Sequence, residues 1–296
     1  MPELYVRSHD LTTAQHGGTE RLTTNNTYYH RLSTIVSLKV ARWFNKYKSI
    51  GRCYPISKKL IVKTGLSVHL TEAATLLFVA ENTSIPVPRV HCSFVFRNRA
   101  YIVMDRIEGD PISSVWWKLS ATDRESIVVQ LRRMLQELRA IKPPPGTGVE
   151  SCVGGSLRDP RMARSRPRFG PFKTIEDFHS WLRGGLQLNN FPNGFTNRGE
   201  KDWEDFKEMA TRQDASQPPP VFTHSDLNPC NILVRGGKVL GIIDWEIAGW
   251  YPPYWEFTSA CYLQIPDWNA VVQKFLDPFP AELKMEEIRQ RWWGEI

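Results

Sequence analysis

Apolar side chains recur every three or four residues in several segments of the chain, a spacing that predicts amphipathic α-helices. Residues 28–47 show it most fully, and the segment from Ser120 to Ile141 shows it over the greatest length. The stretches 71–82 and 200–213 and the stretch that opens near Thr174 are also typical of helices. The apolar positions of the first segment are Leu32, Ile35, Val36, Val40, Trp43 and Phe44.

The residues at the ends of these segments predict where helices start and stop. Thr71 is suited to cap a helix over residues 71–82, and Glu72 complements the positive end of its dipole. The prolines of SIPVPRV require an extended backbone after that helix. Ser120 is suited to cap the long helix, which the PPPG run at residues 143–146 closes.

Strand signals lie on both sides of the helix expected over residues 71–82. LIVKTG and SFVFRNRAYIVMDRI are rich in β-branched and aromatic residues, as strands are. Further along, the runs Ile232 to Val234 and Val239 to Ile243 flank a Gly236–Gly237 turn, which predicts a hairpin. After these short strands the chain is aromatic and is expected to be helical again.

This order of elements predicts two lobes joined near Asp105 to Gly109. We expect a polar N-terminal arm over residues 1–26, a small mixed lobe over residues 27–108 and a mainly helical lobe over residues 109–296. The chain contains no internal repeat.

Composition agrees with a folded globular protein. The 296 residues are 41% hydrophobic and 23% charged, which favours neither disorder nor a fibrous repeat. The net charge of +7 favours anionic ligands or partners. Part of it lies in RDPRMARSRPR, residues 158–168, where the absence of aromatic residues favours a solvated basic loop over a nucleic-acid site.

Five scattered cysteines form no CxxC pair and no zinc-type spacing with histidine, so reduced thiols are expected. The first residues lack an apolar leader segment, and no segment reaches the roughly 18 apolar residues that span a membrane. We expect a cytoplasmic protein, a monomer or weak dimer, with no nucleic-acid or membrane partner.

The densest polar chemistry lies in VFTHSDLNPCNILVRGGKVLGIIDWE, residues 221–246. The hairpin expected there sets Asn231 at the start of its first strand beside Asp244 at the end of its second. Carboxylate and amide oxygens that converge in this way suit Mg²⁺. Asp226 lies just upstream, where its carboxylate can orient a substrate hydroxyl and accept the proton.

Each of these residues also has a purely structural interpretation. Asp226 alone is typical of a turn, and Lys63 alone is typical of a strand-edge charge. The joint spacing of Asp226, Asn231 and Asp244 favours chemistry, and a carboxylate at the end of an apolar run is costly unless it is paired or metal-bound. The pairing of Lys63 with Glu72 is left open by spacing alone, with Glu81 as the other candidate.

Taken together, HSDLNPCNILV and GIIDWEIAGWYPPYWE resemble the aminoglycoside phosphotransferase and choline kinase-like family, most closely its fungal members with DWE rather than DFG at the metal motif. LIVKTG resembles the lysine-bearing strand, TEAATLLFVAENTSIPVPRV the glutamate-bearing helix, and YIVMDRIEGDPI the hinge. The resemblance covers most of residues 60–112 and 221–257. It implies a protein-kinase-like, two-lobed α+β fold with an antiparallel N-lobe sheet and a mainly helical C-lobe.

By this resemblance Asp226 is the catalytic aspartate, and Asn231 and Asp244 are Mg²⁺ ligands. Lys63 binds the α- and β-phosphates and pairs with Glu72, and His224 supports the loop. Nucleotide contacts fall to Met104 at the adenine and to the backbone of Asp105 to Ile107 at the hinge. The resemblance thus implies a Mg-dependent transfer of the γ-phosphoryl group from ATP, or from GTP, to a hydroxyl of a small molecule.

One departure from the family pattern bears on activity. Kinases cover the phosphates with a glycine-rich hairpin before the lysine strand, but SIGRCYPISKKL has only Gly51. Lys58 or Lys59 is a candidate to compensate. The alternative is a pseudokinase that binds nucleotide or metabolite without transfer, and nucleic-acid binding through the arginine loop is a third, weaker hypothesis. The acceptor is expected near Asp226, between the C-terminal helices and the loop after Gly154.

Overall fold

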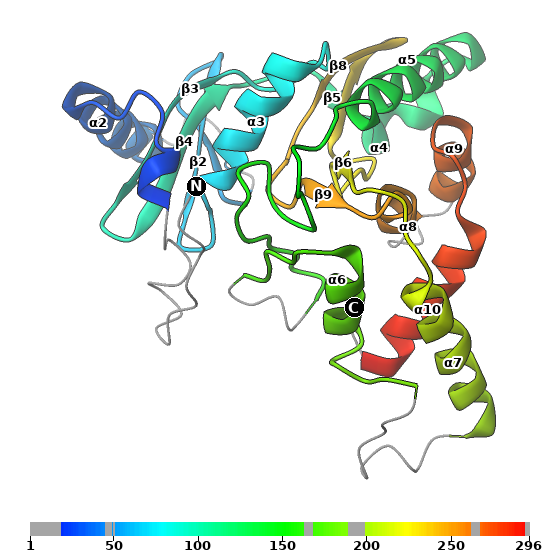
Figure 1. The fold of residues 1–296 in the computed structure, drawn as a ribbon. Helices are drawn as coiled ribbons and strands as arrows, with labels where there is room; N and C mark the ends of the chain where they lie inside the picture. Colours follow the sequence, from blue (N-terminus) through cyan, green and yellow to red (C-terminus); the bar gives the residue numbers. More distant parts are fainter. Residues whose placement is uncertain are drawn as a thin grey trace.

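Four antiparallel strands form the N-terminal sheet of the computed structural model, in the order β1-β2-β4-β3 (Figure 1). Strands β3 and β4 both come from the single strand-rich run in the sequence, and the chain turns between them at Arg97 and Asn98. Both residues have positive φ, 49° and 56°, as a two-residue hairpin turn requires. The strands are β1 Cys53–Pro55, β2 Leu60–Gly65, β3 Val90–Phe96 and β4 Arg99–Asp105. The structure describes residues 19–44, 49, 51–162, 168–188, 199–261 and 267–293.

Helix α3, Thr71–Asn82, lies beside this sheet with the bounds that the sequence predicts. The expected cap is wrong, because Thr71 is the first helical residue and no side chain bonds at the N-cap residue Leu70. The His69 Nδ1 atom instead accepts the backbone N–H of Thr71 at 3.1 Å. An imidazole therefore satisfies one of the open donors of the first turn.

Helix α2, Tyr28–Phe44, differs from an ordinary amphipathic helix in the direction of its apolar face. Such helices bury the apolar face against the core, but here only Thr34 and Leu38 are buried. Arg31 and Arg42 lie on the attached side, over the rings of Phe94 and Tyr54. The apolar residues point away from the sheet. The predicted end of the helix, residues 45–47, lies outside the described residues.

The residues before α2 are tied to the sheet. A short 3-10 helix, η1 Thr19–Leu22, is followed by a bridge between Thr24 and Ser93, and Ser93 Oγ donates to the carbonyl of Leu22. The last part of the expected N-terminal arm is thus packed on β3. Residues 1–18 of that arm lie outside the described residues.

Past Gly109 the chain enters a second sheet, with the order β5-β7-β8. The hairpin expected from the sequence is present, with Gly236 and Gly237 as its turn and Gly236 at a φ of 55°. Two further strands, β6 and β9, pair antiparallel. The strands are β5 Asp110–Pro111, β6 Val221–Thr223, β7 Ile232–Arg235, β8 Lys238–Ile242 and β9 Gly249–Tyr251.

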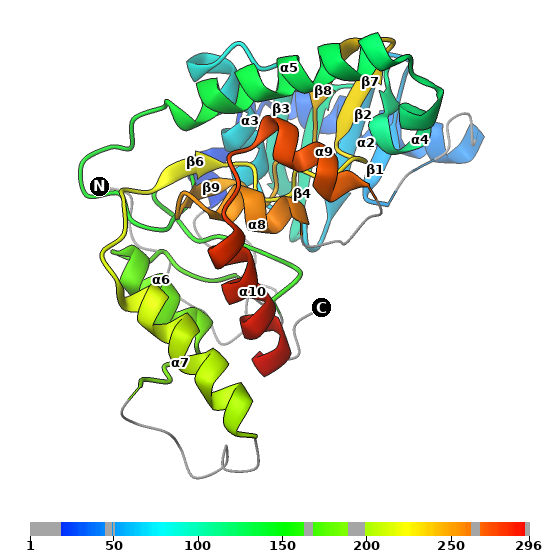
Figure 2. The same cartoon turned by 90° about the vertical axis from the view of Figure 1, so that its right-hand side faces the viewer.

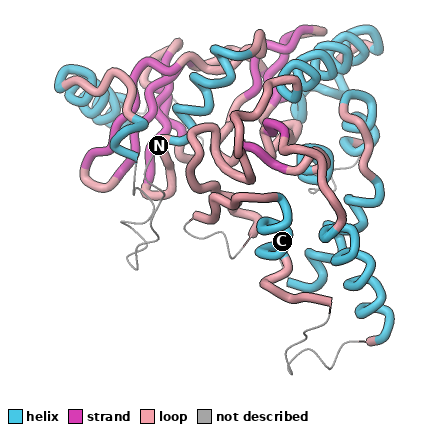
Figure 3. The backbone as a smooth tube through the Cα atoms, in the orientation of Figure 1, coloured by secondary structure: helices cyan, strands magenta, loops and turns pink. Residues whose placement is uncertain are grey.

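Helices dominate the rest of the chain, and the strands gather in the upper half of the molecule (Figures 2 and 3). The cap predicted at Ser120 is confirmed, because Ser120 accepts from the Asp123 N–H. The helix expected to open near Thr174 is present, and Thr174 caps it by accepting from the Asp177 N–H. The helices are α4 Ile112–Val115, η2 Trp116–Lys118, α5 Ala121–Arg139, α6 Ile175–Leu182, α7 Glu200–Asp214, α8 Trp255–Cys261, α9 Trp268–Phe275 and α10 Pro280–Trp293.

One apolar core crosses the boundary predicted between the lobes. It includes Leu76 of α3 and Ile102 of β4 as well as Leu131 of α5 and Trp250 of β9. A second core, around Phe178, packs α6, α7 and α10 together. The α+β class is confirmed, while the division at residues 108–109 stays a prediction.

The state of the cysteines and the length of the helices are both subjects of expectations from the sequence. All five cysteines are free, as expected for reduced thiols. In the part of the chain that the structure describes, every helix is too short or too polar to cross a bilayer.

The long helix offers a test of the core. We predict that Leu131→Ala, at a fully buried position of α5, lowers the free energy of unfolding by about 2–5 kcal/mol through a cavity. Val129→Ala on the same helix is the control, because Val129 is 58% exposed and its truncation should change that free energy by less than about 0.5 kcal/mol. Urea-induced unfolding measures both, and equal effects would contradict the assigned core.

Candidate active site

A buried lysine on β2 brings three carboxylates together. The ammonium of Lys63 lies 2.9 and 2.8 Å from the two carboxylate oxygens of Glu72. It is also 2.5 Å from Asp244 Oδ1 and 3.2 Å from Glu246 Oε2. The pair that spacing left open is therefore formed between Lys63 and Glu72, and Glu81 is exposed at the helix end.

Burial and neighbouring charges both shift the pKa values of the groups in this cluster. Burial alone lowers the pKa of Lys63, but the three carboxylates outweigh burial and raise that pKa. Burial raises the pKa of Glu72 to about 7, and the neighbouring carboxylates add to the rise although Lys63 opposes it. Burial also disfavours the charged form of Asp244, yet Lys63 holds its pKa below the usual value. The three carboxylates are opposed by Lys63 and by the Arg52 guanidinium that pairs with Glu246, so the cluster holds charges of both signs close together.

Asp244 and Asn231 are held next to each other by the hairpin. The backbone N–H of Ile243 donates to the Asn231 carbonyl at 2.9 Å, which joins the start of β7 to the residue before Asp244. Asp244 has a φ of 66°, a left-handed conformation that is strained for most residues and that aspartate tolerates better than others. The turn directs the Asp244 carboxylate to Lys63 rather than along the strand.

Asp226 lies half-buried in the loop between β6 and β7. The side-chain amides of Asn228 and Asn231 donate to its two carboxylate oxygens, at 3.0 and 2.9 Å. Burial raises the pKa of Asp226 to about 6, and the nearby Arg161 guanidinium and these hydrogen bonds oppose the rise. The carboxylate is fixed in orientation, and its pKa is close to neutrality, as general bases require.

His224 connects the Asp226 loop to the Asp244 turn. Its Nδ1 atom accepts the backbone N–H of Asp226 at 3.1 Å, and its Nε2 atom lies 3.0 Å from the carbonyl of Ile243. An imidazole with one accepting and one donating nitrogen is neutral, and burial lowers the pKa of His224 further. The position agrees with a supporting residue.

Glu256 of α8 also holds this loop, a role that was not predicted from the sequence. Its carboxylate accepts the backbone N–H groups of His224 and Ser225, at 2.7 and 3.1 Å. Ser225 has a φ of 69°, so the anchor holds a strained backbone. Burial raises the pKa of Glu256. The one available signal was an acid inside the aromatic run YPPYWEF.

At the expected hinge, only part of the backbone is open to a ligand. The N–H of Asp105 donates to the Arg89 carbonyl, and the N–H of Arg106 donates to the Lys59 carbonyl. Among the described residues, the N–H of Ile107 has no hydrogen-bond partner. The Ile107 side chain lies over Gly241, where any Cβ would overlap with it. Met104 is buried in β4 next to this segment.

Two arginines, not the lysines considered from the sequence, approach the acidic cluster. Arg52, just before β1, contacts both Glu246 carboxylate oxygens at 2.8 and 2.9 Å, and Arg158 lies 4.0 Å from the same carboxylate. Lys58 and Lys59 are exposed in the β1–β2 turn at the hinge end of the sheet. They lie five and four residues before Lys63 in the chain, beside the hinge, where the Lys59 carbonyl accepts the Arg106 N–H.

The solvated interpretation of residues 158–168 is wrong for the arginines that the structure describes. Arg158 donates to the Ser67 carbonyl, and Arg168 is buried with Ser156 as its partner. Arg161 pairs with Asp159 at 2.5 Å and donates to the Ser225 carbonyl, next to Asp226. Residues 163–167 lie outside the described residues.

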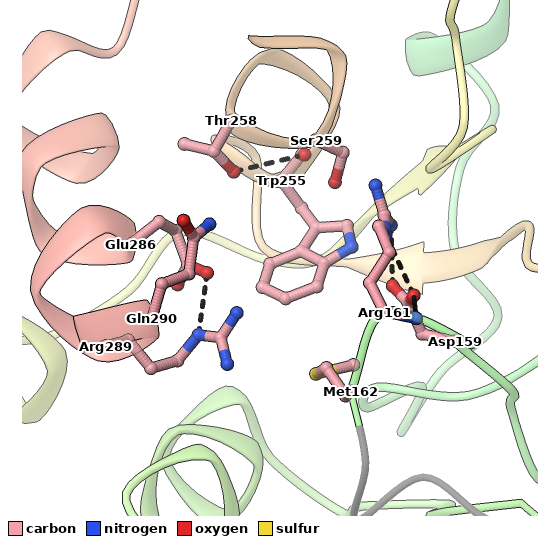
Figure 4. A pocket seen from close by; sticks show the side chains of 9 residues that line it. All are labelled: Asp159, Arg161, Met162, Trp255, Thr258, Ser259, Glu286, Arg289 and Gln290. Carbon is pink, nitrogen blue, oxygen red and sulfur yellow. Dashed lines mark hydrogen bonds and ion pairs between the residues drawn. The ribbon is translucent and has the colours of Figure 1, made fainter. Parts of the chain in front are cut away.

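Beyond Arg161 a pocket opens between this loop and the C-terminal helices (Figure 4). The Trp255 indole lies between two ion pairs, Asp159 with Arg161 and Glu286 with Arg289. Glu286 of α10 is buried in the pocket wall. Both carboxylates of the pocket are neutralised by an arginine.

Comparison with known proteins adds a family and a set of solved folds. The model of the phosphotransferase enzyme family matches residues 67–288, while a comparison with curated protein sequences found no match. An aminoglycoside phosphotransferase APH(4)-Ia variant, in ternary complex with ADP and hygromycin B, is 13% identical with a TM-score of 0.57; the match covers 86% of this chain and 88% of that one. ADP-bound APH(2'')-Ib is 15% identical with a TM-score of 0.53 over 90% and 86%. The expected kinase-like fold is thereby confirmed.

The role of Glu256 in holding the loop can be tested by replacing one of its carboxylate oxygens with an amide nitrogen. Glu256→Gln keeps the shape but leaves one carbonyl oxygen for two N–H donors, so we predict a loss of about 1–3 kcal/mol in the free energy of unfolding. Glu287→Gln, on an exposed position of α10, is the matched control and should be silent in chemical denaturation. An unfolding midpoint of Glu256→Gln equal to that of the wild type would remove Glu256 from this role.

Proposed function

The chain belongs to the phosphotransferase enzyme family, and on that premise we propose that it transfers the γ-phosphoryl group of ATP to a hydroxyl of a small molecule. The observation that carries the proposal is the meeting of Lys63, Glu72 and Asp244 beside the loop of Asp226 and Asn231. Phosphoryl transfer needs this combination of a phosphate-binding cation, metal ligands and a group that orients the nucleophile.

We assign Asn231 and Asp244 to Mg²⁺. The donor chemistry at Asp244 fits, because its carboxylate oxygen lies within 4.8 Å of ligand oxygens of Glu72 and Glu246 and hard oxygens are the ligands that Mg²⁺ prefers. The Asn231 amide nitrogen is used by Asp226, which leaves its amide oxygen for a cation. When bound, Mg²⁺ would neutralise phosphate charge.

The remaining steps belong to the residues of the chain. Asp226, held by two amides, orients the acceptor hydroxyl and takes its proton as the oxygen attacks the γ-phosphorus. Lys63 binds the α- and β-phosphates, positioned by Glu72. Met104 and the free N–H of Ile107, with the backbone at Asp105, bind the base; ATP is proposed, and use of GTP is an outcome to be measured.

Arg52 is proposed to supply the phosphate contacts that a glycine-rich hairpin supplies in kinases. It lies at the Lys63 end of the sheet, since the Thr64 N–H donates to the Arg52 carbonyl. Its guanidinium is held by Glu246 and Ser67, which use part of its five N–H donors. A charged donor fixed beside Lys63 can bind a phosphate oxygen where backbone N–H groups are missing.

The acceptor is placed in the pocket of Figure 4, next to Arg161 and the Ser225 carbonyl. A polycation needs carboxylates that are free to bind it, but Asp159 and Glu286 are both paired with arginines. A hydroxylated acceptor of low charge is therefore favoured over the aminoglycosides bound in the complexes of the solved phosphotransferases. A screen of hydroxylated small molecules with Mg-ATP, with Asp244→Ala as the blank, tests this.

A pseudokinase is the second candidate. It is favoured by the direct contact between Lys63 and Asp244, which occupies both groups, and by the glycine-poor segment before β1. Thermal unfolding with and without Mg-ATP, followed by an ATP-consumption assay, separates the two functions. Stabilisation by Mg-ATP without consumption across the library would favour the pseudokinase.

For the catalytic aspartate, we predict that Asp226→Asn keeps Mg-ATP affinity and loses transfer by a factor on the order of 10² or more, because the amide cannot accept the proton. Calorimetry measures affinity, and turnover on the acceptor from the screen measures transfer. Asp277→Asn, with a side chain 80% exposed, is the control. Full turnover by Asp226→Asn would exclude Asp226 as the base.

For the phosphate contact, we predict that Arg52→Ala raises the Kd for Mg-ATP on the order of tenfold or more, the value of a hydrogen bond to a charged group. Arg132→Ala, an exposed arginine of α5, should leave the Kd unchanged. Unchanged affinity in Arg52→Ala, with wild-type binding present, would assign Arg52 to holding Glu246 only.

A further inference from the structure

The exposed side of α2 is a continuous apolar surface. Its seven residues share one side of the helix, opposite the buried Thr34 and Leu38. Trp43 is 87% exposed and Phe44 71%. We call the seven residues the α2 face: Tyr28, Tyr29, Leu32, Val36, Val40, Trp43 and Phe44. A cluster of large apolar side chains in water marks a binding surface.

The α2 face belongs to a stretch of the chain that has cations but no acid. Two of these cations, Arg52 and Lys63, are paired with carboxylates of the active site, and the other described cations of the stretch are not part of that cluster. No aspartate or glutamate occurs from Arg21 to Thr71, although the chain as a whole has a net charge of only +7. On α2 itself, Lys39 is exposed and there is no acid. The cations of this acid-free segment are Arg21, Arg31, Lys39, Arg42, Lys46, Lys48, Arg52, Lys58, Lys59 and Lys63.

From these two features we propose that α2 docks the protein on an anionic lipid surface. A helix with an apolar side and basic flanks lies in the membrane interface, where apolar side chains enter the acyl boundary and cations meet acidic headgroups. Tyrosines at its start and Trp43 near its end are the residue types that favour the headgroup level. The expectation of no membrane partner rested on the lack of a spanning segment, whereas a helix that lies in the interface needs only one apolar side.

Charge decides against a second copy of the chain as the occupant. A twofold dimer on the α2 face sets the same patch of both copies together, and the exposed Lys39 would then face its own copy across a helix that has no acid to neutralise it. An anionic bilayer neutralises it instead. The proposal does not depend on the phosphotransferase reaction.

The position of α2 is compatible with access to the active site. The helix lies at the outer edge of the N-terminal sheet, on the far side from helices α6, α7 and α10 (Figure 1). Docking through α2 therefore leaves the pocket at Trp255 and Arg161 open to solvent.

The test uses the full chain and vesicles. We expect sedimentation with phosphatidylcholine vesicles that contain about one-third phosphatidylserine, much weaker sedimentation with phosphatidylcholine alone, and a loss of binding as salt rises towards about 1 M. The double variant Trp43→Ser, Phe44→Ser should lower the partition coefficient about tenfold or more, and Lys39→Glu about fivefold or more. Trp117→Ser, 65% exposed on η2, is the control and should bind as the wild type does.

Folding is monitored by the thermal midpoint, which the exposed substitutions should leave unchanged. Three results would overturn the proposal: no sedimentation of the wild type with phosphatidylserine vesicles, equal sedimentation of the double variant, or a wild-type dimer that dissociates in the double variant without any vesicle binding. The last result would assign the α2 face to a second copy.

Discussion

The site depends on one buried ammonium. Lys63 is 3% exposed, and a charge at such depth is stable only with partners of opposite sign. Its three partners come from two places in the chain: Glu72 from α3, and Asp244 and Glu246 from the turn after β8. Satisfying one lysine therefore fixes the helix of the N-terminal sheet and the turn after the hairpin relative to each other. The carboxylate oxygens gathered in this way are hard donors of the kind that a divalent cation prefers.

The loop that carries Asp226 is held by a second set of polar contacts, and these come from the other side. Glu256 holds the backbone of His224 and Ser225, while His224 reaches across to Ile243. On the pocket side, the Arg161 guanidinium donates a hydrogen bond to the Ser225 carbonyl. These contacts hold the backbone of the loop, and the side-chain amides of Asn228 and Asn231 hold the Asp226 carboxylate. The orientation of Asp226 therefore depends on groups that do not touch a substrate themselves. A strained backbone at Ser225 is kept in place by this surrounding structure.

Two surfaces of the molecule show how burial reverses an expectation based on pattern. The arginines of residues 158–168 look solvated in sequence, yet Arg161 and Arg168 are enclosed because Asp159 and Ser156 compensate their burial. The α2 face looks like a core stripe, yet it is exposed because the sheet is contacted by Thr34, Leu38 and two arginines stacked on Phe94 and Tyr54. The hydrophobic pattern of the sequence shows that α2 has an apolar side. Whether that side points to the core or to solvent is decided by the element against which the helix packs.

Local patterns in the sequence determined the longer helices, the β7–β8 hairpin, the cap at Ser120 and the motif that holds Asp226, Asn231 and Asp244. These features follow from interactions between residues a few positions apart, which spacing encodes directly. The tertiary structure alone decided that Arg52 meets Glu246, 194 residues away, that Glu256 supports the loop and that α2 turns its apolar side outward. Such contacts depend on how complete elements pack, because a side chain's partner is set by the position of its whole element and not by its neighbours in the chain.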